Sequence, residues 1–467
     1  MRTTREVTLP LRVDRSLPDA LPAQLTGQLR AMLASGLLRP GDALPSTRAL
    51  AAHLGVSRGT AVTAYDQLVA EGWLDGAPGR STLVNPRLHE VHPDPSPTRE
   101  APRPAAPAAH GVIDLRPGQP MQSGVVGPAW RASWRRAADA PVAVSMPPLG
   151  WPPLRAAIAE HLRRMRAVAP DSDRIAVTAG GREGLALLLA ATGARSVGVE
   201  DPGYPSLRRV LEGAGVALRP LPVDSHGLVT DALPAEAPDL VVVTPSHQYP
   251  LGGSLPIDRR QQLLAWASDR GVTIVEDDYD SELRYTSAPL PALTALDTAG
   301  AVVLLGTFAK TLTPALATGF VVVPPGLLEA VTRVRSRLGQ PVNLVTQRAL
   351  ADYLDSGALL RHTQRMRNLY RRRRAQVVRA LKGLPGVEVY PMDGGLHAVV
   401  EHSQPEELVL ERLYARGAVA SALSGYWSGG EYRARDGSRR GLVFGFGGVS
   451  DAELAAGLAA IRAALTP

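Results

Sequence analysis

The stretch VVLLGTFAKTLTPALATGF, residues 302–320, joins an apolar run typical of a buried β-strand to a turn rich in threonine and proline. Lys310 lies at the start of that turn and is one of only two lysines among the 51 basic residues of the chain. Arginine stays protonated, whereas a lysine can shift its pKa and form a Schiff base with a carbonyl compound. The stretch therefore predicts a reactive amine at the end of a strand.

The composition is that of a soluble globular protein, with 467 residues of which 45% are hydrophobic and 20% are charged. The absence of cysteine excludes disulfides and thiolate metal sites, and we predict no metal site. The net charge of +7 permits nucleic-acid binding without demonstrating it. We expect a cytoplasmic location, because the sequence shows neither a secretory leader nor an apolar run of about 18 residues.

A stretch rich in proline and alanine, residues 86–112, predicts a linker between two domains. The smaller domain would span residues 10–85 and the larger one residues 113–467. In the larger domain, β-branched runs alternate with helical patterns, which predicts an α/β fold with a mostly parallel, doubly wound sheet. After about residue 380 the pattern changes, which indicates a small C-terminal α+β subdomain.

Polar residues follow the predicted strands at 174–181, 196–203, 239–246, 272–278 and 301–307, where ligands of such sheets bind. They are Gly180–Arg182, Tyr204, Ser246–Gln248, Asp277 and Lys310.

The N-terminal domain has the pattern of a helix-turn-helix motif. Leu25, Leu29, Met32 and Leu33 share one face of a first helix. Ser46 is placed to cap a second helix, which buries Leu50 and Leu54 and ends at Gly55. Ser57 is placed to cap a third, in which Val62, Tyr65 and Val69 are expected to face inward.

The third helix would expose Arg58, Gly59, Thr60 and Thr63 near its start, which is the part of a recognition helix that meets base edges. The following WLDGAPGRSTLV predicts a two-stranded wing with Gly79 and Arg80 at its tip. A small three-helix domain that binds protein is the alternative for this segment.

The candidate residues of the large domain suit a pyridoxal phosphate site. Asp277 could keep a pyridine nitrogen protonated, Tyr279 could donate to the ring oxygen, and Tyr204 could stack on the ring. Backbone amides at Gly181 and Arg182 could bind the phosphate at a helix N-terminus, and Thr307 could add a hydroxyl.

Two resemblances follow from these motifs. LPSTRALAAHLGVSRGTAVTAYDQLVAEGWL resembles the winged helix of GntR-type bacterial repressors, in which residues matching Arg48, Arg58, Thr60 and Gly79 contact operator DNA. Ser57 and Arg80 complete the predicted DNA-binding set, although GRST stands here where the family often has GSGT.

IDLRPGQP, EDPGYPS, TPSHQYPLGG, EDDYDSELRY and GTFAKTLTP are similar, in that order, to fold-type I aminotransferases, and most closely to the MocR subfamily of GntR regulators. The resemblance implies that Lys310 is the Schiff-base lysine, Asp277 the pyridine partner, Tyr279 the ring-oxygen partner and Tyr204 the stacking ring. It also implies a head-to-tail homodimer that binds operator DNA and a small-molecule effector.

The sequence departs from that pattern at positions that bind the cofactor phosphate and the substrate. Ala309 replaces a serine, and Ala317 replaces the arginine that grips the phosphate. Arg182, where relatives carry an uncharged residue, could restore that charge. Val443 replaces the arginine that holds a substrate carboxylate. Ser145 replaces a tyrosine that, in relatives, one subunit of the dimer contributes to the site of the other.

Three functions therefore stand side by side. The first, which is the leading interpretation, is a regulator that senses pyridoxal phosphate or a compound reacting with it. The second is an active aminotransferase with an attached DNA-binding module, against which Val443 argues. The third, which Ala309 and Ala317 support, is a regulator with a pocket that no longer binds the cofactor.

Overall fold

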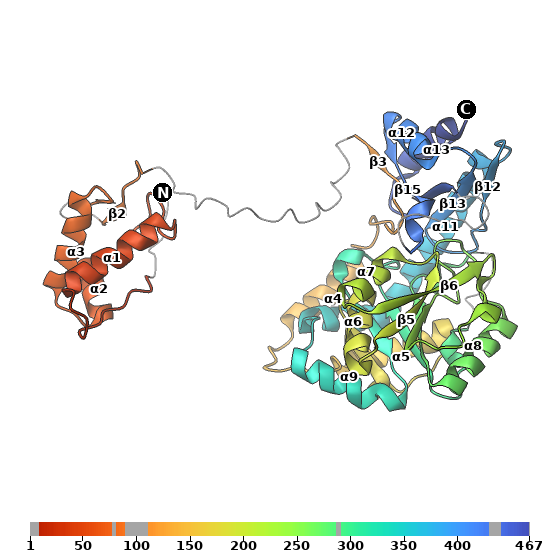
Figure 1. Ribbon diagram of the computed structural model, residues 1–467, viewed down its shortest axis with the longest axis horizontal. Coiled ribbons are helices and arrows are strands. Elements are labelled where there is room, and N and C mark those ends of the chain that lie inside the picture. Colours follow the sequence, from red (N-terminus) through yellow and green to blue (C-terminus); the bar gives the residue numbers. More distant parts are fainter. Residues whose placement is uncertain (1–8, 77–80, 89–110, 286–290, 429–439, 467) are drawn as a thin grey trace. The chain divides into compact units, whose positions relative to one another are not determined.

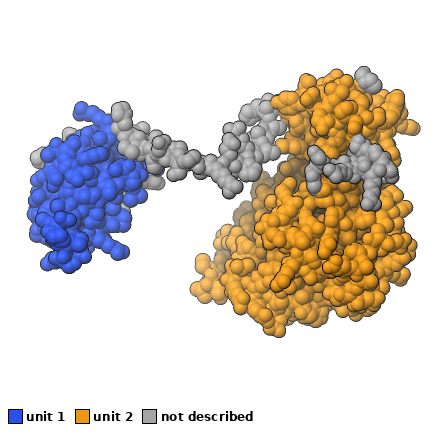
Figure 2. Space-filling model, in the orientation of Figure 1, with its two compact units in different colours: residues 1–106 blue, residues 107–467 orange. Residues whose placement is uncertain are grey.

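The computed structural model describes residues 9–76, 81–88, 111–285, 291–428 and 440–466. The chain forms two compact units, residues 1–106 and 107–467, which are coloured separately in Figure 2. The division falls within the predicted linker, of which residues 89–110 lie outside the described residues.

The described residues of the N-terminal unit form three helices, α1 (Leu21–Ala34), α2 (Thr47–Leu54) and α3 (Arg58–Ala70) (Figure 1). The Ser46 side chain accepts a hydrogen bond from the Ala49 amide at the start of α2, and Gly55 ends that helix with a left-handed φ of 62°. The Ser57 side chain accepts from the Thr60 amide at the start of α3. The predicted caps and the glycine turn are therefore present, and each satisfies backbone groups that a helix end leaves unpaired.

The buried face of α3 differs from the predicted one. Its buried residues are Ala61, Ala64, Tyr65 and Leu68, whereas Val69 is 36% exposed. Small alanines let α3 approach α1 and α2 closely, so the inward face lies one residue earlier than the larger apolar side chains suggested.

The wing after α3 consists of β1 (Leu74–Asp75), which pairs antiparallel with β2 (Leu83–Val84). Residues 77–80, which include the predicted tip residues Gly79 and Arg80, lie outside the described residues.

The large unit is built on a sheet with the strand order β4-β11-β10-β9-β8-β5-β6-β7. The strands from β10 to β6 are mutually parallel, whereas β11 and β7 run antiparallel to their neighbours. This confirms the predicted mostly parallel α/β sheet. Its strands are β4 (Ile175–Thr178), β5 (Ser196–Asp201), β6 (Ala217–Asp224), β7 (Gly227–Leu228), β8 (Leu240–Val243), β9 (Thr273–Asp278), β10 (Val302–Thr307) and β11 (Gly319–Val322).

Helices cover both faces of this sheet, because alternate side chains of each strand point to opposite sides. Val303 and Leu305 of β10 belong to a buried cluster with α6, α7 and α9, while Leu304 belongs to a cluster with α5 and α10. These helices and their neighbours are α4 (Pro128–Asp139), α5 (Pro152–Arg166), α6 (Gly181–Thr192), α7 (Pro205–Gly213), α8 (Ile257–Arg270), α9 (Pro325–Leu338), α10 (Leu344–Asp355) and α11 (Ala358–Leu381).

A second, antiparallel sheet with the order β12-β13-β16-β15 forms the C-terminal subdomain, as the sequence predicted. Its strands and helices are β12 (Val387–Val389), β13 (His397–His402), β15 (Ser421–Ala422), β16 (Gly441–Gly445), α12 (Glu406–Ala415) and α13 (Asp451–Leu465). β3 (Ile113–Asp114), the first strand after the predicted linker, pairs parallel with β14 (Ala418–Val419).

Short 3-10 helices lie in the connections: η1 (Ser172–Arg174), η2 (Thr230–Ala232), η3 (Ser281–Leu283), η4 (Leu293–Ala295), η5 (Pro314–Leu316) and η6 (Leu423–Tyr426). Among the described residues, no helix is both long and apolar enough to cross a membrane.

Candidate cofactor and DNA-binding sites

A cavity of about 270 Å³ opens at the carboxyl ends of β9 and β10, beside the first residues of α6 and α7. All seven cofactor-binding residues predicted from the sequence line it: Gly181, Arg182, Tyr204, Asp277, Tyr279, Thr307 and Lys310. The parallel strands bring these residues together, because their carboxyl ends meet at one edge of the sheet.

The amine of Lys310 lies in the wall of this cavity and donates a hydrogen bond to the carbonyl oxygen of Gly118 at 2.8 Å. Burial lowers the pKa of Lys310, because a charged amine loses hydration, while the carboxylates of Asp280 and Asp277 act in the opposite direction. A lowered pKa increases the fraction of neutral amine, which is the form that attacks an aldehyde.

The carboxyl group of Asp277 is 6% exposed and borders the same cavity. Burial and the negative charges of Asp278, Asp280 and Glu200 together raise the pKa of Asp277 to about 8, while the amine of Lys310 acts in the opposite direction. Within the described part of the chain, no hydrogen bond to this carboxyl group is present. It is thus a buried acid without an ion-pair partner among the described residues, which is the environment that a protonated ring nitrogen would complete.

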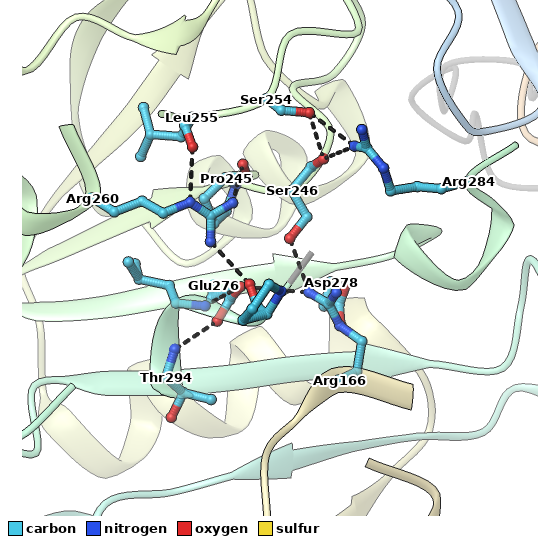
Figure 3. A network of polar contacts seen from close by, with 12 residues as sticks. Arg166, Pro245, Ser246, Ser254, Leu255, Arg260, Glu276, Asp278, Arg284 and Thr294 are labelled. Carbon is cyan, nitrogen blue, oxygen red and sulfur yellow. Dashed lines mark hydrogen bonds and ion pairs between the residues drawn. The ribbon is translucent and has the colours of Figure 1, made fainter. Parts of the chain in front are cut away.

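β9 is held by a network of buried charges on the side of the sheet opposite Asp277 (Figure 3). Arg166, at the end of α5, donates to Asp278 at 2.7 Å and to the Ser246 hydroxyl at 2.9 Å, and its guanidinium lies 3.9 Å from Glu276. Glu276 also accepts from the amides of Leu293 and Thr294. The arginine thus compensates the two carboxylates that flank Asp277 in sequence.

Arg260 and Arg284 hold the loop that follows β8 in the same network (Figure 3). Arg260 donates to the carbonyl oxygens of Leu255 and Pro245, and Arg284 donates to the carbonyl oxygen of Ser246. These contacts fix the segment that carries the next residues of the site.

Aromatic rings form another part of the cavity wall. The ring of Tyr204 meets that of Tyr249 edge to face, with centroids 5.0 Å apart, and Tyr249 in turn meets Tyr279 edge to face at 5.6 Å. The Tyr279 hydroxyl donates to the His247 carbonyl oxygen at 3.0 Å and lies 2.9 Å from His247 Nδ1. That nitrogen also lies 3.0 Å from the carboxylate of Asp280.

Tyr249 was not singled out from the sequence, although it borders the cavity. It directly follows the predicted polar segment Ser246–Gln248, which contains His247, so its place in a loop at the carboxyl end of β8 was the signal that could have identified it. Burial raises the pKa of Tyr249 well above its ordinary value, so its hydroxyl stays protonated and available as a donor.

The N-terminus of α6 faces the cavity through Gly180, Gly181 and Arg182. Gly180 has a left-handed φ of 86°, and a Cβ atom there would meet nothing within 4 Å, which leaves room for a ligand. A Cβ on Gly184 would lie 2.5 Å from Leu305 Cδ1, so glycine lets α6 pack tightly on β10. Arg182 is exposed, and it has no ion pair among the described residues.

The predicted departures from the aminotransferase pattern have clear structural settings. Ala309 and Ala317 both border the cavity, and Ala317 has a positive φ of 45°. Val443, in contrast, is fully buried in β16, between β13 and β15, and packs in an apolar cluster with Tyr249 and Leu423. The position predicted to match the carboxylate-binding arginine of aminotransferases is here part of a hydrophobic core.

Four of the predicted DNA-binding residues lie on α2 or at the start of α3, whereas Gly79 and Arg80 lie outside the described residues. The side chains of Arg48 and Arg58 are exposed, Thr60 is partly exposed, and Ser57 caps α3. Their contact with DNA stays a prediction, with which this exposure is compatible.

The residues of the cavity fit pyridoxal phosphate by the chemistry of their groups. An amine with a lowered pKa suits an aldehyde, the buried acid of Asp277 suits a pyridine nitrogen, and the open α6 N-terminus with the unpaired Arg182 suits a phosphate.

The chain matches two family models. Residues 21–84 match the gntR family of bacterial regulatory proteins, and residues 111–425 match the class I and II aminotransferases. The HTH-type pyridoxine biosynthesis transcriptional regulator PdxR of Corynebacterium glutamicum is 47% identical over 440 residues, which cover 94% of each chain. The probable rhizopine catabolism regulatory protein MocR of Rhizobium meliloti is 32% identical, over 97% of this chain and 95% of the relative.

Among solved structures, the kynurenine aminotransferase of Pyrococcus horikoshii superimposes with a TM-score of 0.68 at 24% identity, covering 76% of this chain and 91% of that one. The α-aminoadipate aminotransferase LysN of Thermus thermophilus gives a TM-score of 0.67 at 23% identity, covering 76% and 92%. These likenesses show the aminotransferase fold of the large unit.

Proposed function

We propose, from the premise that this chain belongs to the MocR type of GntR transcriptional regulators, that its large unit binds pyridoxal phosphate and that this binding controls DNA binding by the winged helix. The observation that carries the proposal is the meeting of the Lys310 amine and the Asp277 carboxyl group at one cavity. The name of the Corynebacterium relative, a regulator of pyridoxine biosynthesis, supports a vitamin B6 compound as the effector.

Each residue of the cavity has a definite task in this proposal. When bound, pyridoxal phosphate supplies an aldehyde carbon and an electron-withdrawing ring. Lys310 provides the attacking nitrogen, and Asp277 holds a proton that it shares with the ring nitrogen. Tyr204 covers one face of the ring, and Arg182 and the α6 amides hold the phosphate.

The contact between Lys310 and Gly118 offers a route from the cavity toward the linker. Gly118 lies four residues after β3, the first strand that follows the predicted linker. A bound aldehyde that engaged the Lys310 amine would leave it fewer hydrogens to donate, so binding would weaken its hydrogen bond to Gly118. A ligand changes DNA affinity only to the extent that it binds one conformation of the protein more tightly than another. In this proposal, the two conformations differ in whether Lys310 holds the carbonyl oxygen of Gly118.

The same residues argue against turnover of amino acids. The buried Val443 provides no guanidinium for a substrate carboxylate, so we propose that the large unit binds its cofactor without sustained transamination. We also propose a homodimer, which would place two winged helices on two operator half-sites through Arg48, Arg58 and Thr60.

The proposal is tested by selecting preferred duplexes from a random library with the full chain, and then measuring their dissociation constants with and without added pyridoxal phosphate. We expect the cofactor to change the affinity of the parent protein and to leave that of a Lys310→Ala variant unchanged. An equal response in both proteins, or no response in the parent, would contradict the proposal. A steady release of keto acid from amino acids would contradict the absence of turnover.

A further inference from the structure

α11 is the most basic element of the described chain. It has 24 residues, among which are eight arginines and no aspartate or glutamate. The helix contacts α10, α13, η3 and β12, so part of its surface is buried and the rest faces solvent. Several of its arginines have partners within the chain. Arg373 is 2% exposed and binds Asp451, and Arg374 donates to the carbonyl oxygen of Met392. Arg367 donates to the carbonyl oxygen of Arg284, and the exposed Arg361 donates to that of Ser356.

Four exposed arginines form a straight row on the outer side of α11: Arg361, Arg365, Arg372 and Arg379. At 100° per residue, these four positions fall within about 40° of one another around the helix axis. Eighteen residues separate the first from the last, which corresponds to about 27 Å along the axis. We call this row the α11 arginine stripe.

The stripe differs from the paired arginines of α5 and α9 because its charges are not neutralised, a condition that it shares with Arg131 and Arg135 of α4. On α5, Arg163 and Arg164 both pair with Glu160, and on α9 Arg333 pairs with Glu329. None of the four stripe arginines has an ion pair within the ranges that the structure describes. Like charges four residues apart, such as Arg361 and Arg365, repel one another and destabilise a helix, so packing alone does not account for them.

We infer that the α11 arginine stripe binds the phosphate backbone of duplex DNA and thereby adds a second, sequence-independent contact to that of the winged helix. A length of about 27 Å matches about eight base pairs of a duplex, and arginine is suited to phosphate. The inference rests on the proposed DNA-binding function, because DNA held by the winged helix is present near the tethered large unit at a high effective concentration.

The test uses the full chain and a fluorescent, mixed-sequence duplex of about 40 base pairs, with binding followed by anisotropy between about 50 and 200 mM salt. The stripe variant carries Arg365→Gln, Arg372→Gln and Arg379→Gln. A control variant carries Arg163→Gln, Arg333→Gln and Arg337→Gln, and so loses the same charge from exposed positions on other helices. A third variant, with lysine at the three stripe positions, keeps the charge.

We expect the stripe variant to bind at least about tenfold more weakly at low salt, with a slope of log K against log salt that falls by about one for each arginine removed. The control and lysine variants should stay close to the parent. Equal losses in the stripe and control variants would mean that only net charge matters, and would overturn the inference.

Two further measurements separate this inference from others. An Arg58→Ala variant should lose discrimination between duplexes and retain stripe-dependent binding, so a failure of the winged-helix assignment would be seen independently of the stripe. Vesicles of equal parts phosphatidylserine and phosphatidylcholine serve as a second polyanion. Stripe-dependent binding to these vesicles without stripe-dependent binding to DNA would overturn the inference in favour of a membrane surface.

Discussion

Among single residues, Asp277 carries the strongest electrostatic signal of the cavity. Its acid is buried beside three other carboxyl groups, and its pKa rises from an ordinary value of 3.8 to about 8. Such an acid stays protonated near neutral pH until a cation arrives, and the ring nitrogen of a pyridine compound is a suitable one.

This pKa shift predicts how stability depends on pH in the ligand-free protein. Because the folded state binds the Asp277 proton more tightly than the unfolded state, the free energy of unfolding decreases as pH rises from about 4 to about 8. Asp277→Asn removes this contribution while other titrating groups remain. In urea denaturation, the free energy of unfolding of the variant relative to that of the parent should increase as the pH rises from 5 to 8. A difference between the two free energies that stays constant over this range would contradict the assignment.

Arg182 and Ala317 border the phosphate end of the cavity and allow a paired test. Arg182→Gln removes a charge-assisted contact of about 1.5–3 kcal/mol, which predicts roughly ten- to a hundredfold weaker binding of pyridoxal phosphate. Adding Ala317→Arg to that variant should restore much of the affinity, because Ala317 already adopts its positive φ with a Cβ atom. Unchanged cofactor affinity in Arg182→Gln, measured by equilibrium dialysis, would show that Arg182 does not bind the phosphate.

At the scale of elements, β9 depends on the arginine of a neighbouring helix. Arg166→Met leaves Glu276 and Asp278 buried without their guanidinium, and predicts a loss of about 3–5 kcal/mol in the free energy of unfolding. Arg163→Met on the same helix breaks only an exposed, solvent-screened pair with Glu160 and should leave the free energy of unfolding nearly unchanged. Similar losses in the two variants, by urea denaturation, would contradict the role given to the buried network.

Local sequence predicted most elements of the fold and the strand ends that line the cavity. Ser46, Ser57 and Gly55 could be placed because capping depends on a few neighbouring residues. The inward face of α3 could not be predicted in this way, since close packing of the helices buries the small Ala61 and Ala64 and leaves Val69 exposed.

Local sequence patterns could not predict the contacts between segments that are distant in the chain. Tyr249 reaches the cavity through the packing of its loop against the C-terminal subdomain, and Lys310 meets Gly118 across 192 residues of sequence. Neither the buried setting of Val443 nor the exposed row on α11 follows from composition, because both depend on how the helices and sheets pack.

At the scale of the whole molecule, two compact units joined by a predicted linker should unfold separately. Calorimetry of the full chain is expected to show two transitions. Pyridoxal phosphate at a hundred times its dissociation constant should stabilise only the larger unit, by about 2.7 kcal/mol. The Lys310→Ala variant should show a much smaller shift, and a shift of both transitions by the cofactor would contradict independent unfolding.

The presence of only two lysines makes the reactive amine directly measurable. Lys382 is exposed at the end of α11 and serves as an internal control for non-specific reaction, whereas Lys310 borders the cavity. The full chain is incubated with pyridoxal phosphate, reduced with borohydride and digested, and the modified lysine is identified by mass spectrometry. The account predicts that modification saturates at Lys310 while Lys382 stays largely unmodified. Modification of Lys382 alone, or equal modification of both residues at every cofactor concentration, would contradict it.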